Sequence, residues 1–166
     1  MPYFYNTTKT PGTPGSFFTG NGTPNTKSTH LRFATVANQL TAKLMGLYGN
    51  ARFSTAGGGM LALVRGGAAG SGGTSNTPSK TDTYGERAAD LTAFDDGSAI
   101  TAGTSPLQQK TVGIAQTGGQ GGWVALDDAD ALLLAPNGGA NGNMEMASFF
   151  STASVTFDAT IVHKEG

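Results

Sequence analysis

The chain has 166 residues, a length typical of a single domain. Its net charge of -1 lacks the basic excess with which nucleic-acid-binding proteins neutralise phosphates, and the absence of cysteine excludes disulfides, thiolate zinc sites and thiol catalysis. Charged residues make up only 13% and hydrophobic residues 37% of the chain, whereas glycine occurs 26 times, so we expect a small core that partner subunits help to stabilise.

Residues 1–28 are predicted to form an extended arm. Proline and glycine alternate there, and neither the helical nor the strand period is present. The segment nevertheless holds five of the fourteen aromatic residues of the chain: Tyr3, Phe4, Tyr5, Phe17 and Phe18. Rings on a segment without its own core must be buried against another surface. We therefore predict that these five residues anchor the arm on a neighbouring subunit; the alternative is an arm folded over its own domain.

The start of the chain also bears on its location. The first ten residues hold no basic segment followed by an apolar run, so we expect no secretory signal. No stretch approaches the roughly 18 apolar residues of a membrane-spanning helix. We expect a protein that contacts neither membrane nor nucleic acid.

Residues 29–48 are the best candidate for a helix. Val36, Leu40, Leu44 and Leu47 recur at steps of three and four residues, which is the helical period. This spacing predicts a helix near residues 33–48 that packs across a sheet. In the alternative, alternation from Leu31 onward makes the first part a strand, and only residues 36–48 are helical.

The remaining chain predicts strands joined by glycine-rich turns. Arg52–Thr55 and Met60–Arg65 flank Gly57–Gly59, a run that permits a tight reversal. Residues 66–83 predict a long loop, because they are mostly glycine, serine, threonine and asparagine. Further strands are predicted at Lys110–Gln116, from Trp123 to Leu126 after a turn at Gly118–Gly122, and at Asn143–Phe150. Residues 127–134 are either a short helix capped by Asp127 or a turn followed by a buried strand at Ala131–Ala135.

The last strand has the clearest pattern. Val155, Phe157, Ala159 and Ile161 alternate with polar residues, as in a strand with one buried face. The whole pattern predicts a mainly β protein. It has a β-sandwich or jelly-roll-like body over residues 29–166, one helix and an extended N-terminal arm.

Residue types that carry catalysis are sparse. Nothing in the sequence brings the two histidines together. His163, beside Lys164 and Glu165, is predicted to be a solvated strand end, and His30 to be structural or at an interface. The G-x-S-x-G nucleophile motif is absent. We predict no catalytic residue, no bound metal and no cofactor.

Acidic clusters, glycine runs and the single tryptophan have ordinary interpretations. Asp95–Asp96, before Gly97, is either a turn or a pair of ligands for a hard cation. The group Asp127, Asp128 and Asp130 lacks the spacing of a calcium loop, so turn and capping roles are expected. The glycine runs lack the residues of phosphate-binding loops. Trp123, which follows Gly121–Gly122, is either a core or interface anchor or the platform of a sugar-binding recognition surface.

The chain resembles the capsid decoration (cement) proteins of tailed bacteriophages. The resemblance lies in the arm with Tyr3-Phe4-Tyr5 and Phe17-Phe18, in the cysteine-free, low-charge body with loops such as 66–78, and in the final alternating strand 153–161 followed by His163-Lys164-Glu165. It is one of overall texture and includes no specific motif.

The resemblance implies a non-enzymatic virion protein on the outer surface of the capsid, assembled in the host cytoplasm. Its partners would be the major capsid protein and copies of itself, as trimer or dimer. It would bridge neighbouring capsid subunits and resist the pressure of packaged DNA. The alternative is a tail, baseplate or host-recognition β-sandwich, in which Trp123 and the loops 66–83 and 136–143 form the recognition surface.

Overall fold

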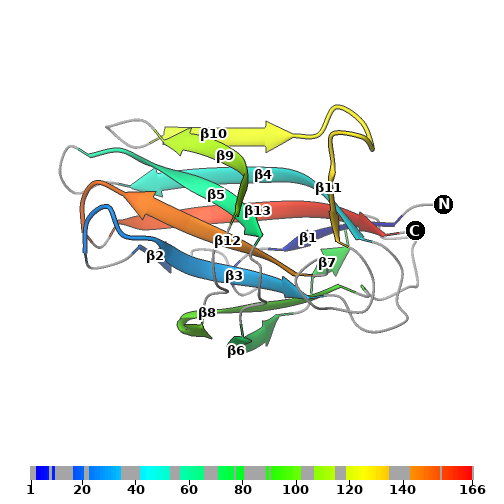
Figure 1. Cartoon of the computed structure of the whole chain (residues 1–166), viewed down its shortest axis with the longest axis horizontal. Helices are drawn as coiled ribbons and strands as arrows, with labels where there is room; N and C mark the ends of the chain where they lie inside the picture. Colours follow the sequence, from blue (N-terminus) through cyan, green and yellow to red (C-terminus); the bar gives the residue numbers. More distant parts are fainter. Residues whose placement is uncertain are drawn as a thin grey trace.

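Figure 1 shows the computed structural model of the chain. It describes residues 3–7, 9, 17–20, 23–34, 42–52, 57–65, 71–76, 78–80, 89, 91–101, 107–114, 119–134, 143–153 and 155–165. Within these ranges every regular element is a β-strand, and the strands form two antiparallel sheets. The protein is therefore mainly β, as predicted.

Sheet A contains seven strands. Its main order is β10-β4-β13-β1-β7; β11 also pairs with β4, and β2 with β13. The bounds are β1 Tyr3–Thr7, β2 Phe18–Thr19, β4 Ala42–Arg52, β7 Ser79–Lys80, β10 Gly119–Val124, β11 Leu132–Leu134 and β13 Thr156–Glu165. Tyr3 pairs with Glu165, so the two ends of the described chain lie side by side.

Sheet B contains six strands in the order β6-β8-β3-β12-β5-β9. The bounds are β3 Ser28–Ala34, β5 Gly59–Arg65, β6 Ser71–Asn76, β8 Thr92–Thr101, β9 Leu107–Ile114 and β12 Asn143–Phe150.

The two sheets share one hydrophobic core. Most of the buried residues lie on β3, β5 and β12 of sheet B and on β4 and β13 of sheet A; among the largest are Leu31, Phe33, Leu44, Leu47, Leu61, Leu63, Met144, Met146, Phe157 and Ile161. Each such side chain adds about 1.5–3 kcal/mol when fully buried. The sheets approach closely at Gly49, where a Cβ atom would overlap the side chain of Leu61.

The predicted helix near residues 33–48 is wrong over its described parts. Residues up to Ala34 belong to β3 and those from Ala42 onward belong to β4, and residues 35–41 lie outside the described ranges. On β13, His163 pairs with Leu44 and the preceding residue with Gly46, so Met45 is the extra residue of a β-bulge. The bulge resets the alternation of β4. Leu44 and Leu47 both reach the core although they are three residues apart, and that spacing imitates a helix.

The described parts of residues 1–28 also differ from the predicted extended arm. β1 lies inside sheet A between β13 and β7, and β2 pairs with β13. Tyr5 and Phe18 are 0% and 2% exposed in the core of the same chain. The alternative, an arm folded over its own domain, describes these strands. Most of residues 8–16 lies outside the described ranges.

Glycine-rich segments form strands and crossings between sheets. Gly57–Gly59 does not close the predicted hairpin, because β4 belongs to sheet A and β5 to sheet B. Part of the loop predicted at 66–83 is strand: Ser71–Asn76 forms β6, which pairs with β8. Gly72 and Gly73 have φ values of 76° and 88°, a conformation that side chains disfavour, and the register of β6 shifts there. The turn predicted at 118–122 is likewise mostly strand β10.

Other predicted strands are present. Asn143–Phe150 matches β12, β9 overlaps the predicted strand at 110–116, and β11 follows a turn as one of the two interpretations of 127–134 required. The final strand β13 has the predicted alternation, which extends to its last residue.

Candidate functional site: the outer face of sheet A

His30 is enclosed in the core. It is the extra residue of a β-bulge on β3, because Leu31 pairs with Met146 and Thr29 with the next residue of β12. Its Nε2 atom lies 2.7 Å from the Ser148 hydroxyl, and its ring packs edge-on against a phenylalanine at 4.8 Å. Burial, and secondly the charge of a nearby lysine, lower the pKa of His30 to about 4. The histidine and serine are both buried, so this pair has a structural role.

His163 is also buried, with 0% exposure, so the predicted solvated strand end is wrong. Its ring stacks on Tyr5 at 5.1 Å between centroids, and its Nε2 atom lies 3.2 Å from Glu165 Oε1. The same carboxylate oxygen accepts a 2.7 Å hydrogen bond from the backbone N–H of Leu91. The burial of His163 could be predicted from the sequence, because the alternation of β13 places residues 163 and 165 on the same face as Phe157.

Of the two acidic clusters, the one at Asp127 forms a turn, as expected, whereas Asp95 and Asp96 lie within strand β8 instead of a turn. Asp127 Oδ1 accepts hydrogen bonds from the backbone N–H groups of Ala129 and Asp130, at 2.8 and 3.0 Å. Asp95 accepts a 2.9 Å hydrogen bond from the side chain of Asn76, and the side chain of Asp96 is outside the described set. Among the described residues no three histidine or acidic side chains gather as a metal site would require.

Exposed apolar side chains gather on one face of the molecule. The large hydrophobic residues that are exposed, within the described ranges, are Phe4, Tyr48, Val124, Leu126 and Leu133. Four of them lie on strands of sheet A, and the fifth, Leu126, lies two residues after the end of β10. The cross-strand pairing sorts the outer residues of this face into two ends with different chemistry.

The first end, here called the apolar–basic end, lies where β4 begins and β13 finishes. Leu133 pairs with Lys43, Lys43 with Lys164, and Lys164 with Phe4, so the four form one row across sheet A. Asp128 bonds both lysines, at 3.0 Å to Lys43 and by a short contact to Lys164. The hydrogen bond from Lys164, and then that from Lys43, lower the pKa of Asp128.

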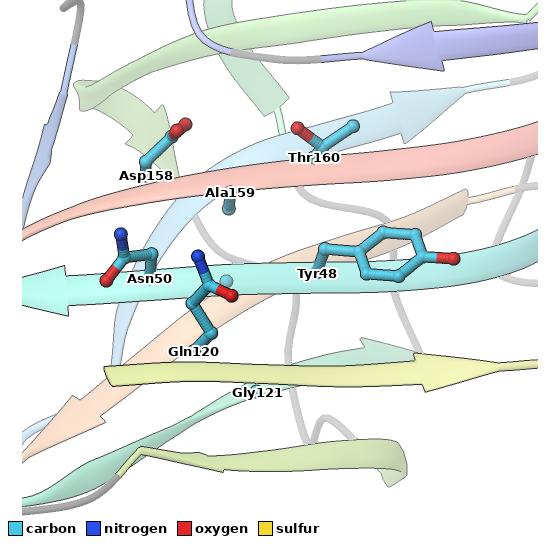
Figure 2. A pocket seen from close by; sticks show the side chains of 8 residues that line it. Tyr48, Asn50, Gln120, Gly121, Asp158, Ala159 and Thr160 are labelled. Atoms are coloured by element: carbon cyan, nitrogen blue, oxygen red, sulfur yellow. The ribbon is translucent and has the colours of Figure 1, made fainter. Parts of the chain in front are cut away.

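The second end, here called the Tyr48 groove, crosses β10, β4 and β13. It has a volume of about 260 Å³, and five side chains line it: Tyr48, Asn50, Gln120, Asp158 and Thr160. Figure 2 shows all five on the same side of the sheet; the tyrosine ring runs along β4 in the direction away from the amide and carboxyl groups. Glycine and alanine form the floor between them.

The ring of Tyr48 lies over two glycines. A Cβ atom on Gly46 would be 3.2 Å from Cε2 of the ring, and one on Gly122 would be 3.1 Å from Cδ1. One face of the ring therefore covers bare backbone of β4 and β10, while the side chain remains 44% exposed. The result is a flat aromatic platform on an otherwise polar surface.

Trp123 does not provide the predicted recognition platform. It pairs with Leu47, whose side chain is in the core, and it packs against that core as a partly buried residue. Trp123 therefore fits the first interpretation, an anchor in the core, better than the second, a recognition platform. The exposed aromatic residue of this region is Tyr48, the last residue of the predicted helix.

The five predicted anchors of the arm have different environments. Tyr5 and Phe18 are core residues, Phe17 is half-buried, and Phe4 is 40% exposed on the apolar–basic end. The side chain of Tyr3 is not among those described. Of the described four, only Phe4 presents an exposed surface for a partner.

Comparison with protein-family models, with curated proteins and with solved structures finds no match to this chain. None of the ranges that the structure describes contains a helix able to span a membrane.

Proposed function

We propose that this chain is a β-sandwich virion protein that decorates and cements a bacteriophage capsid, and that it docks through the apolar–basic end of sheet A. The observation that carries the proposal is the gathering of exposed large apolar side chains on this one sheet. Scattered single residues of this kind need no explanation, whereas several on the outer face of one sheet indicate an interaction surface.

The row is suited to a protein partner. Leu133 and Phe4 stand at its two sides, and the aliphatic stems of Lys43 and Lys164 fill the middle. Asp128 holds both ammonium groups, so the row carries a net single positive charge beside its apolar ends. An acidic, partly apolar surface of a neighbouring capsid subunit would complement it.

The contact differs from the one that the sequence suggested. Because Tyr5 and Phe18 belong to the chain's own core, the proposed docking surface is a preformed sheet face rather than an arm that becomes ordered on binding. A rigid surface loses less conformational entropy on association. Each copy then contributes a modest free energy, and repetition over the shell multiplies it.

The test is co-sedimentation of the purified protein with shells assembled from the major capsid protein of the same virus. We expect saturable binding and a higher melting temperature of the shell. Leu133→Asp should weaken binding by roughly tenfold or more, as expected for loss of an apolar anchor. Thr19→Asp is the matched control, because Thr19 is exposed on the same sheet but pairs at the far end of β13.

Two outcomes would overturn the proposal. One is a wild-type protein that stays in the supernatant at every shell concentration. The other is a Leu133→Asp variant that binds as tightly as Thr19→Asp.

A further inference from the structure

We infer that the Tyr48 groove is a binding site for a neutral carbohydrate. This inference goes beyond the proposed capsid role and uses the other end of the same face. It rests on the shape of the tyrosine platform, on the polar groups beside it and on the charge of the lining.

The platform is built for stacking from one side. Gly46 and Gly122 leave no side chain beneath the ring of Tyr48, so the ring lies against the backbone and turns its second face outward. A pyranose ring has a face of C–H groups, and such a face packs against an exposed aromatic ring.

The neighbouring side chains supply hydrogen bonds of both kinds. Asn50 and Gln120 pair across β4 and β10, and Asp158 pairs with Asn50 from the other side, so two amides and a carboxylate form one row. Amides donate and accept hydrogen bonds, while a carboxylate accepts them from adjacent hydroxyl groups. Thr160 pairs with Tyr48 and adds a hydroxyl group that points toward the side of Asp158 (Figure 2). This combination matches a ligand covered in hydroxyl groups.

Charge and size narrow the class of ligand. Among the described residues that line the groove there is no lysine, arginine or histidine, so this lining does not favour phosphate or another anion. A single carboxylate is too few for a calcium or magnesium site, which takes several oxygen ligands. The volume of about 260 Å³ is slightly below the roughly 300–1,000 Å³ of pockets for drug-sized ligands. An open groove of this size suits one or two sugar rings of a longer polysaccharide.

The experiment is affinity electrophoresis of the full chain in native gels that contain dextran, mannan, galactan or soluble β-glucan. We expect at least one of these neutral polysaccharides to retard the wild-type protein. Tyr48→Ala should raise the dissociation constant about tenfold or more, whereas Tyr48→Phe should change it by less than about threefold, because the stacking face is kept. Asp158→Asn should weaken binding by an intermediate factor.

Two further variants separate the groove from the rest of the face. Gly122→Ala places a methyl group against the ring, so it should weaken binding while every polar group is unchanged. Val124→Ser alters an exposed residue of the same strand outside the groove and should bind like the wild type.

The inference is overturned if none of the four polysaccharides retards the wild-type protein, or if Tyr48→Ala is retarded as strongly as the wild type. Shell binding by the Tyr48→Ala variant distinguishes the two proposals. If Tyr48→Ala loses polysaccharide binding but still sediments with shells, both proposals hold. Leu133→Asp should lose shell binding and still be retarded by the polysaccharide, because it does not alter the groove.

Discussion

The Nε2 atom of His30 lies 2.7 Å from the hydroxyl group of Ser148, and both side chains are buried between the two sheets. The imidazole ring also makes edge-to-face contacts with the rings of Phe18 and Phe157, so its surroundings are largely aromatic. A charged imidazole is poorly solvated in such a place, which is why burial is the main cause of its low pKa.

This environment predicts a stability that falls as the solution becomes acidic. The pKa of His30 is about 4 in the folded chain and 6.5 when unfolded, so between these values the unfolded chain binds a proton that the folded chain rejects. The stabilisation is complete above about pH 7 and is lost as the pH falls towards 4. From pH 7 to pH 5 the loss due to this group is roughly 2 kcal/mol.

The measurement is urea unfolding of the wild type and of His30→Gln at both pH values. The variant is less stable at pH 7 because the core is altered, but its stability should fall by roughly 2 kcal/mol less between the two pH values. Other titrating groups affect both proteins alike. The same pH dependence in the two proteins would refute the assignment.

Glu165 is the second buried group whose loss we expect to be costly. Its Oε1 atom accepts the backbone N–H of Leu91 and lies 3.2 Å from the ring of His163. Glu165→Ala removes the acceptor and leaves buried polar groups unpaired, which costs about 1–3 kcal/mol or more. Lys164→Ala is the control: its ammonium group bonds the exposed Asp128, and such pairs contribute about 0–1 kcal/mol.

Thermal and urea unfolding of both variants at pH 7 compare the two effects. A Glu165→Ala variant as stable as Lys164→Ala would mean that the last strand is not anchored by its buried carboxylate.

Strands with undisturbed alternation were predictable from the sequence, and strands with a bulge were not. Phe157, Ala159 and Ile161 follow one another at steps of two, and this alternation predicts the strand that the structure shows as β13. In β4 the bulge at Met45 puts Leu44 and Leu47 three residues apart, and local periodicity then indicates a helix. Where an extra residue enters a strand is decided by its partner strand, which lies more than 100 residues away along the chain.

The Tyr48 groove could not be predicted from the sequence either, because it also depends on the pairing of strands that are distant along the chain. The flat position of Tyr48 depends on Gly122 of β10, a residue that becomes its neighbour only through sheet pairing. Strand β6 is held mainly by backbone pairing with β8 and carries small polar side chains, so its composition indicates a loop. The sequence of residues 1–28 indicates an extended arm because proline and glycine recur there, although the rings of Tyr5 and Phe18 belong to the chain's own core.

A glycine at the start of β5 supports the close pairing of β5 and β12. A Cβ atom on Gly59 would collide with the carbonyl oxygen of Phe149 and come within 2.6 Å of Cδ1 of Phe150. Gly59→Ala should therefore destabilise the fold by about 1–3 kcal/mol, the usual cost of overpacking. Gly113→Ala is the matched control, because nothing lies within 4 Å of its Cβ position.

Urea unfolding of the two alanine variants, side by side, checks this contact. We expect Gly113→Ala to stay within about 0.5 kcal/mol of the wild type, as exposed substitutions usually do. Equal stability of the two variants would contradict the pairing of Gly59 with Phe150.

The N-terminal aromatic residues should divide into a core set and a surface set. Phe18 stacks on Phe157 at 5.3 Å in the core, whereas Phe4 is exposed beside Lys164. In the isolated protein, Phe18→Ala should lower the free energy of unfolding by about 3–5 kcal/mol, and Phe4→Ala by less than about 1 kcal/mol. Phe4→Ala should weaken shell binding, because Phe4 lies on the apolar–basic end. Phe18→Ala, where it still folds, should weaken shell binding less, because Phe18 does not lie there. If Phe18→Ala leaves the stability of the isolated chain unchanged, the first strands are not part of the fold, and an arm that anchors on a partner becomes the better explanation.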